Sequence, residues 1–346
     1  MKSAVFMKAG QVTVEDIAKP TIQAPDDVII NVVRTCVCGS DLWAYRGLED
    51  KAAHSENSGH EAIGIVESVG SDITTVQPGD FVIAPFTHGC GHCAACLAGF
   101  DGDCQNHSDN FSDGVQAETI RFQHGDWALI KIPGQPADYS DAILNSLLSL
   151  ADVMATGYHA ARVANVKTGD TVVVVGDGAV GLCGVIAAKM RGAKRIISMS
   201  RHADRQQLAL EFGATDIVAE RGDDAIAKVM TLTNNAGADA VLECVGTELS
   251  NETAMKTARP GAIVGRVGLP HEPKMDMTAS FYRNTIIAGG PASVTTYDKQ
   301  LLLKAVLDGD IHPGKVFTKR FKLDDIDAAY QAMTNREAIK ALITID

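Results

Sequence analysis

Four cysteines lie within one short, glycine-rich segment in the pattern C-x2-C-x2-C-x7-C. They are Cys90, Cys93, Cys96 and Cys104. Glycines permit the turns that bring several sulfur atoms around one ion, and four thiolates form a closed, structural zinc site. A disulfide pair fits poorly, because thiols stay reduced in the cytosol and the chain shows no export signal. The spacing therefore predicts a structural zinc lobe at about residues 88–106, with unrelated loop cysteines as the alternative.

A second set of potential metal ligands is spread over the first half of the chain. Cys38 and His60 are separated by 21 residues, and Asp152 follows much later. Three protein ligands with one open position are what a catalytic zinc requires. Each residue also has a structural alternative: a small buried cysteine, a hydrogen-bonded core imidazole and a helix N-cap. The residue types by themselves leave both interpretations open.

A glycine motif in the second half predicts a dinucleotide site. The β-branched run Thr171–Val175 leads into GDGAVG, whose glycines stand in the order G-x-G-x-x-G, and the helix-forming LCGVIAAKM follows. In that setting backbone N–H groups and a helix N-terminus hold a pyrophosphate, whereas a glycine-rich turn without a ligand is the alternative. The candidate cofactor-binding residues here and after two later predicted strands are Gly176, Gly178, Ala179, Val180, Gly181, Val245, Gly246, Val267 and Gly268.

The residues after the second predicted strand favour NADP(H) over NAD(H). NAD-specific sites carry an acidic residue about 20 positions after the glycines, where it binds the ribose hydroxyls. This chain instead has Ser200, Arg201 and His202. An arginine can pair with a 2′-phosphate through charge-assisted hydrogen bonds. The alternative is that Arg201 is a solvated residue at the start of a helix.

Composition indicates a globular protein of two domains. The chain has 346 residues, of which 46% are hydrophobic and 21% charged. That length exceeds what one hydrophobic core usually supports, and no apolar run is long enough to span a membrane. A net charge of −12 opposes binding to nucleic acid or anionic lipid. We therefore expect a cytoplasmic protein whose partner is a small molecule.

The pattern of apolar runs changes near Ser149. Residues 1–150 contain short β runs separated by glycine, proline and aspartate, typical of a barrel-like β unit. Beyond them, short apolar strands alternate with helical segments, which predicts a parallel sheet covered by helices on both faces. Spacing leaves open whether the segment after about residue 290 closes the second domain or returns to the first.

These motifs together resemble the zinc-dependent medium-chain alcohol dehydrogenases. The resemblance rests on C-G-S-D, on G-H-E about twenty residues later, on the four-cysteine lobe and on G-x-G-x-x-G, and it covers essentially the whole chain. It is closest to the bacterial branch of NADP-dependent secondary-alcohol dehydrogenases. The α/β fold that it implies has a GroES-like, β-rich catalytic domain at 1–150, a doubly wound Rossmann domain at 151–288, and a segment at 289–346 that completes the catalytic domain.

The resemblance assigns the second metal group. It implies that Cys38, His60 and Asp152 bind a catalytic zinc and that Glu61 is an exchangeable fourth ligand. Cys36 is the competing thiolate, but the family motif begins at the cysteine that precedes G-S-D, which is Cys38. Each chain would then hold two zinc ions, one catalytic and one structural.

The resemblance also gives roles to residues around that metal. Asp41 would orient the imidazole ligand through its second ring nitrogen, and Ser40 would pass on the substrate proton. Trp43 stands where many family members have a proton-relaying histidine, so we expect it, with Phe86, to line the substrate pocket. His54 is either a substitute relay or a surface loop residue, and loop position favours the surface.

The implied reaction is hydride transfer between NADP(H) and a small alcohol, ketone or aldehyde. A zinc ion acidifies a bound alcohol or polarises a carbonyl, and the nicotinamide carries the hydride. The alternatives are a polyol dehydrogenase of the same family and a non-catalytic zinc- and nucleotide-binding redox sensor. The resemblance further suggests a homodimer or homotetramer.

Overall fold

The computed structural model describes residues 1–54, 58–106, 112, 114–270, 276–292 and 296–345. The chain divides into two compact units. Unit 1 comprises Met1–Asp152 and Ser293–Asp346, and unit 2 comprises Val153–Ala292. The boundaries of the units thus fall near residues 152 and 293.

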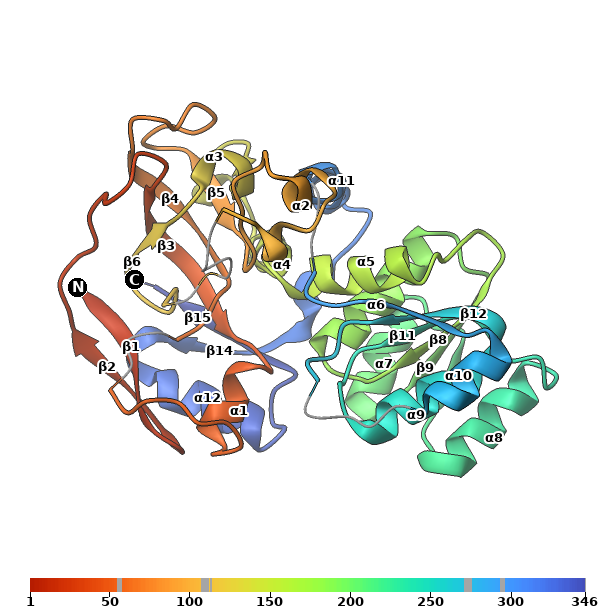
Figure 1. The fold of residues 1–346 in the computed structure, drawn as a ribbon. Coiled ribbons are helices and arrows are strands. Elements are labelled where there is room, and N and C mark those ends of the chain that lie inside the picture. Colours follow the sequence, from red (N-terminus) through yellow and green to blue (C-terminus); the bar gives the residue numbers. More distant parts are fainter. Residues whose placement is uncertain (55–57, 107–111, 113, 271–275, 293–295, 346) are drawn as a thin grey trace. The chain divides into compact units, whose positions relative to one another are not determined.

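Unit 1 is rich in antiparallel strands (Figure 1). Its strands and helices are β1 (Lys2–Lys8), β2 (Gln11–Asp16), β3 (Val28–Val37), α1 (Asp41–Tyr45), β4 (Ala62–Val69), β5 (Phe81–Ala84), α2 (Ala94–Leu97), β6 (Thr119–Phe122), α3 (Gly125–Ala128), β7 (Ile130–Ile132), α4 (Asp141–Ser149), α11 (Thr296–Leu307), β14 (Phe317–Lys322), α12 (Ile326–Thr334) and β15 (Lys340–Thr344). Among the described residues, β14, β15, β3, β4, β5 and β7 form one sheet in that order, and β6 also pairs with β3.

The C-terminal strands belong to the sheet of unit 1. Strand β15 pairs antiparallel with β3, so that Ala341 lies opposite Val37. Strand β14 then pairs with β15 in parallel. Because β3 runs between β15 and β4, residues from both ends of the chain meet at one place in the sheet.

Unit 2 alternates strands and helices. Its elements are α5 (Val153–Val163), β8 (Thr171–Val175), α6 (Ala179–Met190), β9 (Arg195–Met199), α7 (Ala203–Phe212), β10 (Asp216–Val218), α8 (Gly222–Leu232), β11 (Ala238–Glu243), α9 (Glu248–Thr257), β12 (Ala258–Arg266), α10 (Met277–Arg283) and β13 (Ile286–Gly289). The strands form a parallel sheet in the order β10-β9-β8-β11-β12-β13.

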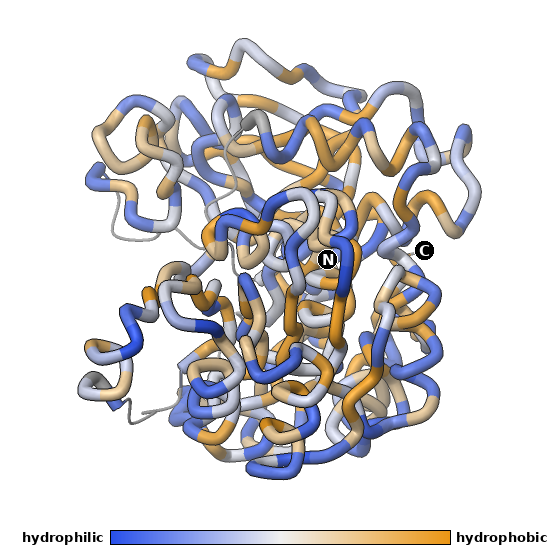
Figure 2. Tube along the Cα trace, turned by 90° about the vertical axis from the view of Figure 1, so that its right-hand side faces the viewer, coloured by the Kyte–Doolittle hydropathy of each residue, from blue (hydrophilic) through white to orange (hydrophobic). Residues whose placement is uncertain are grey.

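Helices cover both faces of this sheet (Figure 1). The strand order reverses between β8 and β11, and ligands of such sheets bind outside the carboxyl ends of the strands at that point. Four valines follow Thr171 in β8, and all four are buried, as is typical of a central parallel strand packed on both sides. Figure 2 shows hydrophobic residues concentrated on such inner elements and hydrophilic residues on the outer loops.

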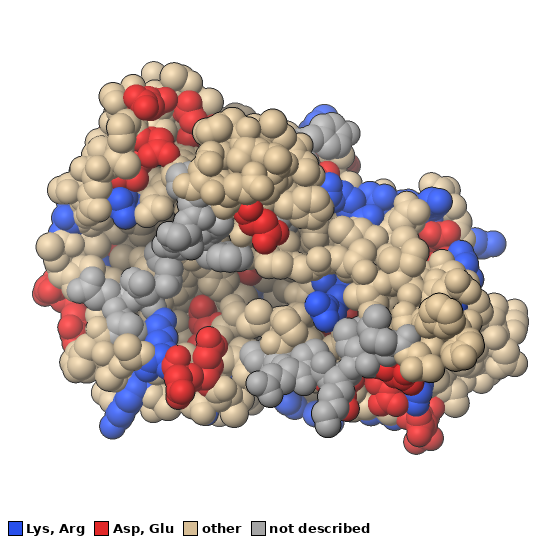
Figure 3. Space-filling model, viewed as in Figure 1, with Lys and Arg blue, Asp and Glu red and all other residues tan. Residues whose placement is uncertain are grey.

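The predicted α/β class is confirmed: a β-rich unit is combined with a doubly wound parallel sheet. None of the described helices is both long and apolar enough to cross a bilayer. On the face shown in Figure 3, both basic and acidic side chains are visible.

Candidate metal centres and cofactor site

The pairing of β3 with β4 brings two of the predicted zinc ligands together. Thr35 lies opposite Ala62 in this ladder, and the Thr35 hydroxyl donates to the backbone carbonyl of Glu61 at 2.8 Å. Cys38 follows the end of β3 and His60 precedes β4, so both side chains lie at the same edge of the sheet. A strand register fixed on both sides by buried residues holds this edge in place.

Asp152 reaches the same place from the turn after α4. The Ser140 side chain caps the start of α4 by accepting from the Ile143 N–H. After the helix ends at Ser149, the Ala151 carbonyl accepts from the N–H of Phe86 at 2.9 Å. This bond ties the turn to the segment after β5.

The structure brings four potential ligands into one group. The Asp152 Oδ2 atom lies 3.4 Å from Cys38 Sγ and 3.4 Å from His60 Nε2. Glu61 Oε1 lies 3.9 Å from His60 Nε2. The ligand atoms of all four residues lie within 4.8 Å of one another. This is a suitable donor set for zinc, which binds sulfur, imidazole nitrogen and carboxylate oxygen in a tetrahedron.

Asp41 faces the other ring nitrogen of His60. Its Oδ1 lies 3.5 Å from His60 Nδ1, and its Oδ2 accepts from the Cys38 N–H at 2.8 Å. Burial alone would raise the pKa of Asp41, but the imidazole and this N–H outweigh burial and lower it. Burial likewise would lower the pKa of His60, yet Asp41, Cys38 and Asp152 raise it well above its usual value. The Asp41 carboxylate thus lies at Nδ1, while Nε2 of the imidazole faces the other potential ligands.

Behind the ligands lies a buried ion pair. Lys340 Nζ lies 2.6 Å from Glu61 Oε1 and donates to the Val37 carbonyl at 3.2 Å, and both charged side chains are 1% exposed. The second oxygen of Glu61, Oε2, is buried without a hydrogen-bond partner among the described residues. A buried, unsatisfied carboxylate oxygen next to a thiol, an imidazole and another carboxylate fits a divalent cation.

The predicted pocket and relay residues differ in burial and in the contacts they make. The Phe86 ring lies 6.0 Å from the His60 ring. Ser40 is half-buried at the start of α1, and its hydroxyl makes no cap bond there. Trp43 is half-buried within α1. His54 is exposed, as expected for a surface loop residue.

Cys36 lies near the ligand group but is not one of the four donors that converge there. It is 1% exposed, and burial raises the pKa of its thiol well above the usual value. Its carbonyl accepts from Gln116 Nε2 at 3.0 Å, and the Gln116 Oε1 accepts from the Tyr330 hydroxyl at 3.0 Å. This polar network supports the strand that leads to Cys38.

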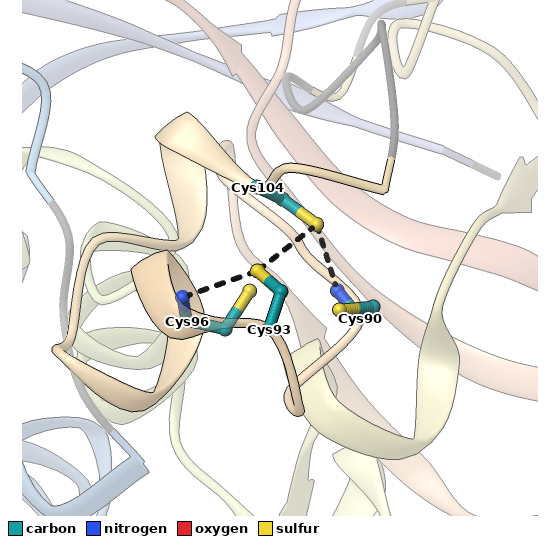
Figure 4. A group of neighbouring side chains, drawn as sticks. All are labelled: Cys90, Cys93, Cys96 and Cys104. Atoms are coloured by element: carbon teal, nitrogen blue, oxygen red, sulfur yellow. Dashed lines mark hydrogen bonds between the residues drawn. The ribbon is translucent and has the colours of Figure 1, made fainter.

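The four cysteines of the lobe converge, as Figure 4 shows. Their sulfur atoms lie within 4.8 Å of one another. Cys93 Sγ accepts from the backbone N–H groups of Cys96 and Gln105, each at 3.5 Å, and these bonds lower the pKa of the Cys93 thiol to about 6. A Cβ atom on Gly89 would lie 2.7 Å from Cys96 Sγ, so only glycine permits this approach. The lobe thus fits a zinc ion.

A second buried pair lies beside the lobe. Lys299 on α11 lies 3.7 Å from Asp101, and their side chains are 4% and 1% exposed. Burial lowers the pKa of Lys299, while Asp101 and Cys96 act in the opposite direction. The ammonium group offsets part of the negative charge that four thiolates bring.

Cys93→Ser is expected to reduce zinc content by one ion per chain and to lower the unfolding temperature by about 5 °C or more, because a closed zinc site contributes folding free energy. Turnover by the remaining folded protein should change little. Calorimetry and metal analysis measure both effects. Cys244→Ser, outside both ligand groups, is the control. Loss of turnover with an unchanged unfolding temperature would mean that the roles of the two groups are reversed.

The glycine motif forms the turn between β8 and α6. Gly176 has a φ of 116°, and a Cβ atom on Gly181 would lie 2.0 Å from the Gly176 carbonyl oxygen. Gly178 is the N-cap of α6, Ala179 and Val180 begin the helix, and no side chain of the cap occupies its first N–H groups. The turn is therefore shaped to admit a pyrophosphate.

The later candidate residues lie at the same edge of the sheet. Glu243 Oε1 accepts from the N–H groups of Val245 and Gly246 at 2.9 and 2.8 Å. Its carbonyl accepts from the N–H groups of Val267 and Gly268 at 2.9 and 3.1 Å. Glu243 thus fixes the two loops that follow β11 and β12, a role that has no local sequence signal.

The end of β9 differs from the expectation in one respect. Ser200 is buried and donates from its hydroxyl to Asp177 Oδ2 at 2.9 Å. Arg205 Nη1 donates to Asp177 Oδ1 at 3.3 Å. Arg201 is exposed, with no hydrogen bond or ion pair to the part of the chain that the structure describes, and His202 is the half-buried N-cap of α7. An acidic group is therefore present here, supplied by the glycine motif.

Comparison with known proteins agrees with this arrangement. The family model for the alcohol dehydrogenase GroES-like domain matches residues 24–134, and that for zinc-binding dehydrogenases matches residues 179–299. An alcohol dehydrogenase of Cupriavidus necator is 28% identical over 97% of this chain and 96% of its own. An NADP-dependent isopropanol dehydrogenase of Clostridium beijerinckii is 34% identical over 70% of this chain and 68% of its own.

A solved structure resembles the whole chain. The alcohol dehydrogenase from Thermus sp. ATN1 has a TM-score of 0.90 and 29% identity, and the match covers 100% of both chains. A GroES-like unit with a group of four potential metal ligands and a Rossmann-type sheet with a dinucleotide turn define a metal- and nicotinamide-dependent oxidoreductase. The chain belongs to the zinc-dependent medium-chain alcohol dehydrogenase family, as its motifs predicted.

Proposed function

We propose that this protein transfers hydride between NADP(H) and a small, uncharged alcohol or ketone, with Cys38, His60 and Asp152 as ligands of the catalytic zinc. The observation that carries the proposal is the convergence of these donors with Glu61, whose Oε2 atom is buried without a hydrogen-bond partner in the described part of the chain. A bound zinc ion supplies Lewis acidity toward the substrate oxygen.

The protein residues position the groups and carry the proton. A bound nicotinamide cofactor would supply the hydride acceptor for the substrate carbon. Ser40 would relay the proton of the substrate hydroxyl to solvent, taking it up as it gives its own hydroxyl proton away. Asp41 keeps the imidazole in the orientation that the metal site needs. The Phe86 ring beside His60 supplies an apolar wall that favours an uncharged substrate.

The substrate class separates this proposal from a polyol dehydrogenase. A polyol site pairs several substrate hydroxyls with polar groups, since an unpaired buried polar group is costly. The apolar Phe86 ring favours the smaller substrate, and two relatives bear the name NADP-dependent isopropanol dehydrogenase. We therefore expect secondary alcohols with three to five carbons to exceed polyols in kcat/KM.

Arg201 supports the preference for NADP(H), because an exposed guanidinium after β9 is available to a 2′-phosphate. Arg201→Ala should lower kcat/KM for NADPH by about tenfold or more and change that for NADH by about twofold at most. Arg221→Ala, at another exposed arginine of unit 2, is the matched control. Steady-state kinetics with a small ketone measure both cofactors. A wild-type preference for NADH, or equal losses with both cofactors, would reject the cofactor assignment.

A further inference from the structure

The turn between β8 and α6 carries an acidic residue that the reaction does not use. Asp177 stands between the first two glycines of the motif, and both it and Arg205 have side chains that are 13% exposed. Its carboxylate accepts from Ser200 and from Arg205, and its carbonyl accepts a further bond from Arg205 at 3.2 Å. Asp177 is thus held firmly toward the end of β9.

The end of β9 is where the adenosine ribose of a dinucleotide is recognised in doubly wound sheets. In NAD-binding members of this architecture an acidic residue at the end of the second strand accepts from the ribose hydroxyls. Strand β9 pairs in parallel with β8, so Val175 lies opposite Met199, and the two following loops adjoin. Asp177 therefore brings a carboxylate to this position from the neighbouring loop.

We infer that Asp177 is a specificity-determining residue that limits the preference for a 2′-phosphorylated cofactor. Its carboxylate engages Ser200 and Arg205, two donors that a 2′-phosphate would otherwise use. It also places a negative charge beside the site of that phosphate. A ribose hydroxyl, by contrast, can donate to the same carboxylate. The inference rests on the proposed function, since it concerns the same cofactor site.

The surrounding contacts keep Ser200 in place when Asp177 is changed. Gln206 Nε2 donates to the Ser200 carbonyl at 2.8 Å, and the Ser200 N–H donates to the Val218 carbonyl at 2.9 Å. Asp177→Asn retains the size of the side chain, removes its charge and replaces one acceptor oxygen with an NH2 group. Because only one acceptor oxygen remains, at least one of the two donors, the Ser200 hydroxyl or the Arg205 guanidinium, becomes available to an incoming phosphate in addition to Arg201.

Isothermal titration with ADP-ribose and 2′-phospho-ADP-ribose tests this inference without any turnover, because the two probes differ only in the 2′-phosphate. In Asp177→Asn the ratio of their dissociation constants should shift about tenfold or more toward the phosphorylated probe. Asp170→Asn removes the same charge at the opposite end of β8, about 20 Å away, and should leave the ratio unchanged. Asp177→Ser provides a second variant should the asparagine variant fold poorly.

An unchanged ratio in folded Asp177→Asn and Asp177→Ser, or an equal gain for both probes, would overturn the inference. A shift of the same size in Asp170→Asn would also overturn it, because the effect would then be one of net charge. The result is separable from the proposed function. If the wild-type enzyme prefers NADH, the cofactor assignment fails, yet a selective gain for the phosphorylated probe in Asp177→Asn still supports the role of Asp177.

Discussion

Replacing His60 with alanine is expected to lower kcat/KM by about a thousandfold or more while the fold persists. In the proposed site the imidazole is one of three zinc ligands, and it lies 3.4 Å from the Asp152 carboxylate, which is another. Loss of a ligand releases the Lewis acid, whose stabilisation of the transition state is worth several kcal/mol, and about 4 kcal/mol corresponds to a thousandfold in rate. Steady-state kinetics, circular dichroism and metal analysis together measure the outcome.

His54→Ala is the matched control for this variant, because it makes the same chemical change at an exposed histidine. We expect it to retain wild-type kinetics and full zinc content. Asp41→Asn should fall between the two, with a loss of roughly 10–100-fold, since it loosens the imidazole without removing a ligand. Near-normal turnover by His60→Ala protein shown to lack the second zinc would refute the assignment.

Replacing Lys340 with methionine should destabilise the protein by about 3–5 kcal/mol, because it leaves the Glu61 carboxylate buried without its cation. The expected fall in unfolding temperature is about 10 °C. Thermal or urea unfolding of chelator-treated protein measures the effect without the compensation that a bound metal ion would provide.

Two further variants test whether the destabilisation by Lys340→Met comes from the unpaired charge of Glu61. Lys319→Met removes the cation of a surface pair with Glu337, which lies between α12 and β15. The two side chains are 40% and 54% exposed, so the change in stability should be about 1 kcal/mol at most. The double variant Lys340→Met/Glu61→Gln should recover most of the loss, since neither charge of the pair then remains. If Lys340→Met lowered the stability equally in the wild-type and the Glu61→Gln backgrounds, the loss of stability would be due to packing and not to charge.

Some features could be predicted because their signals are local. The four cysteines of the lobe lie within fifteen consecutive residues, so their spacing alone indicates that the sulfur atoms can meet. The glycine motif likewise joins a buried strand to a helix within one short segment. The alternation of strands and helices in unit 2 predicted its parallel sheet for the same reason.

Other features depend on pairings that the sequence does not display. Lys340 is a single lysine in an apolar strand, and nothing nearby indicates that its partner is Glu61. No local sequence pattern distinguishes Asp177 from other loop residues. Only the order of strands in the sheet shows that its loop adjoins the end of β9. The acidic group near the end of β9 therefore comes from between the glycines and not from about 20 residues after them.

The pairing of β15 with β3 also sets an order of events during synthesis. Lys340 follows Glu61 by 279 positions, so a ribosome must make nearly all of this chain before that ammonium group can reach the metal ligands. Until then a nascent polypeptide presents Cys38, His60, Glu61 and Asp152 with one positive charge fewer than the finished protein has. Zinc captured early would therefore meet a more anionic set of donors than zinc that binds after strand β15 has docked.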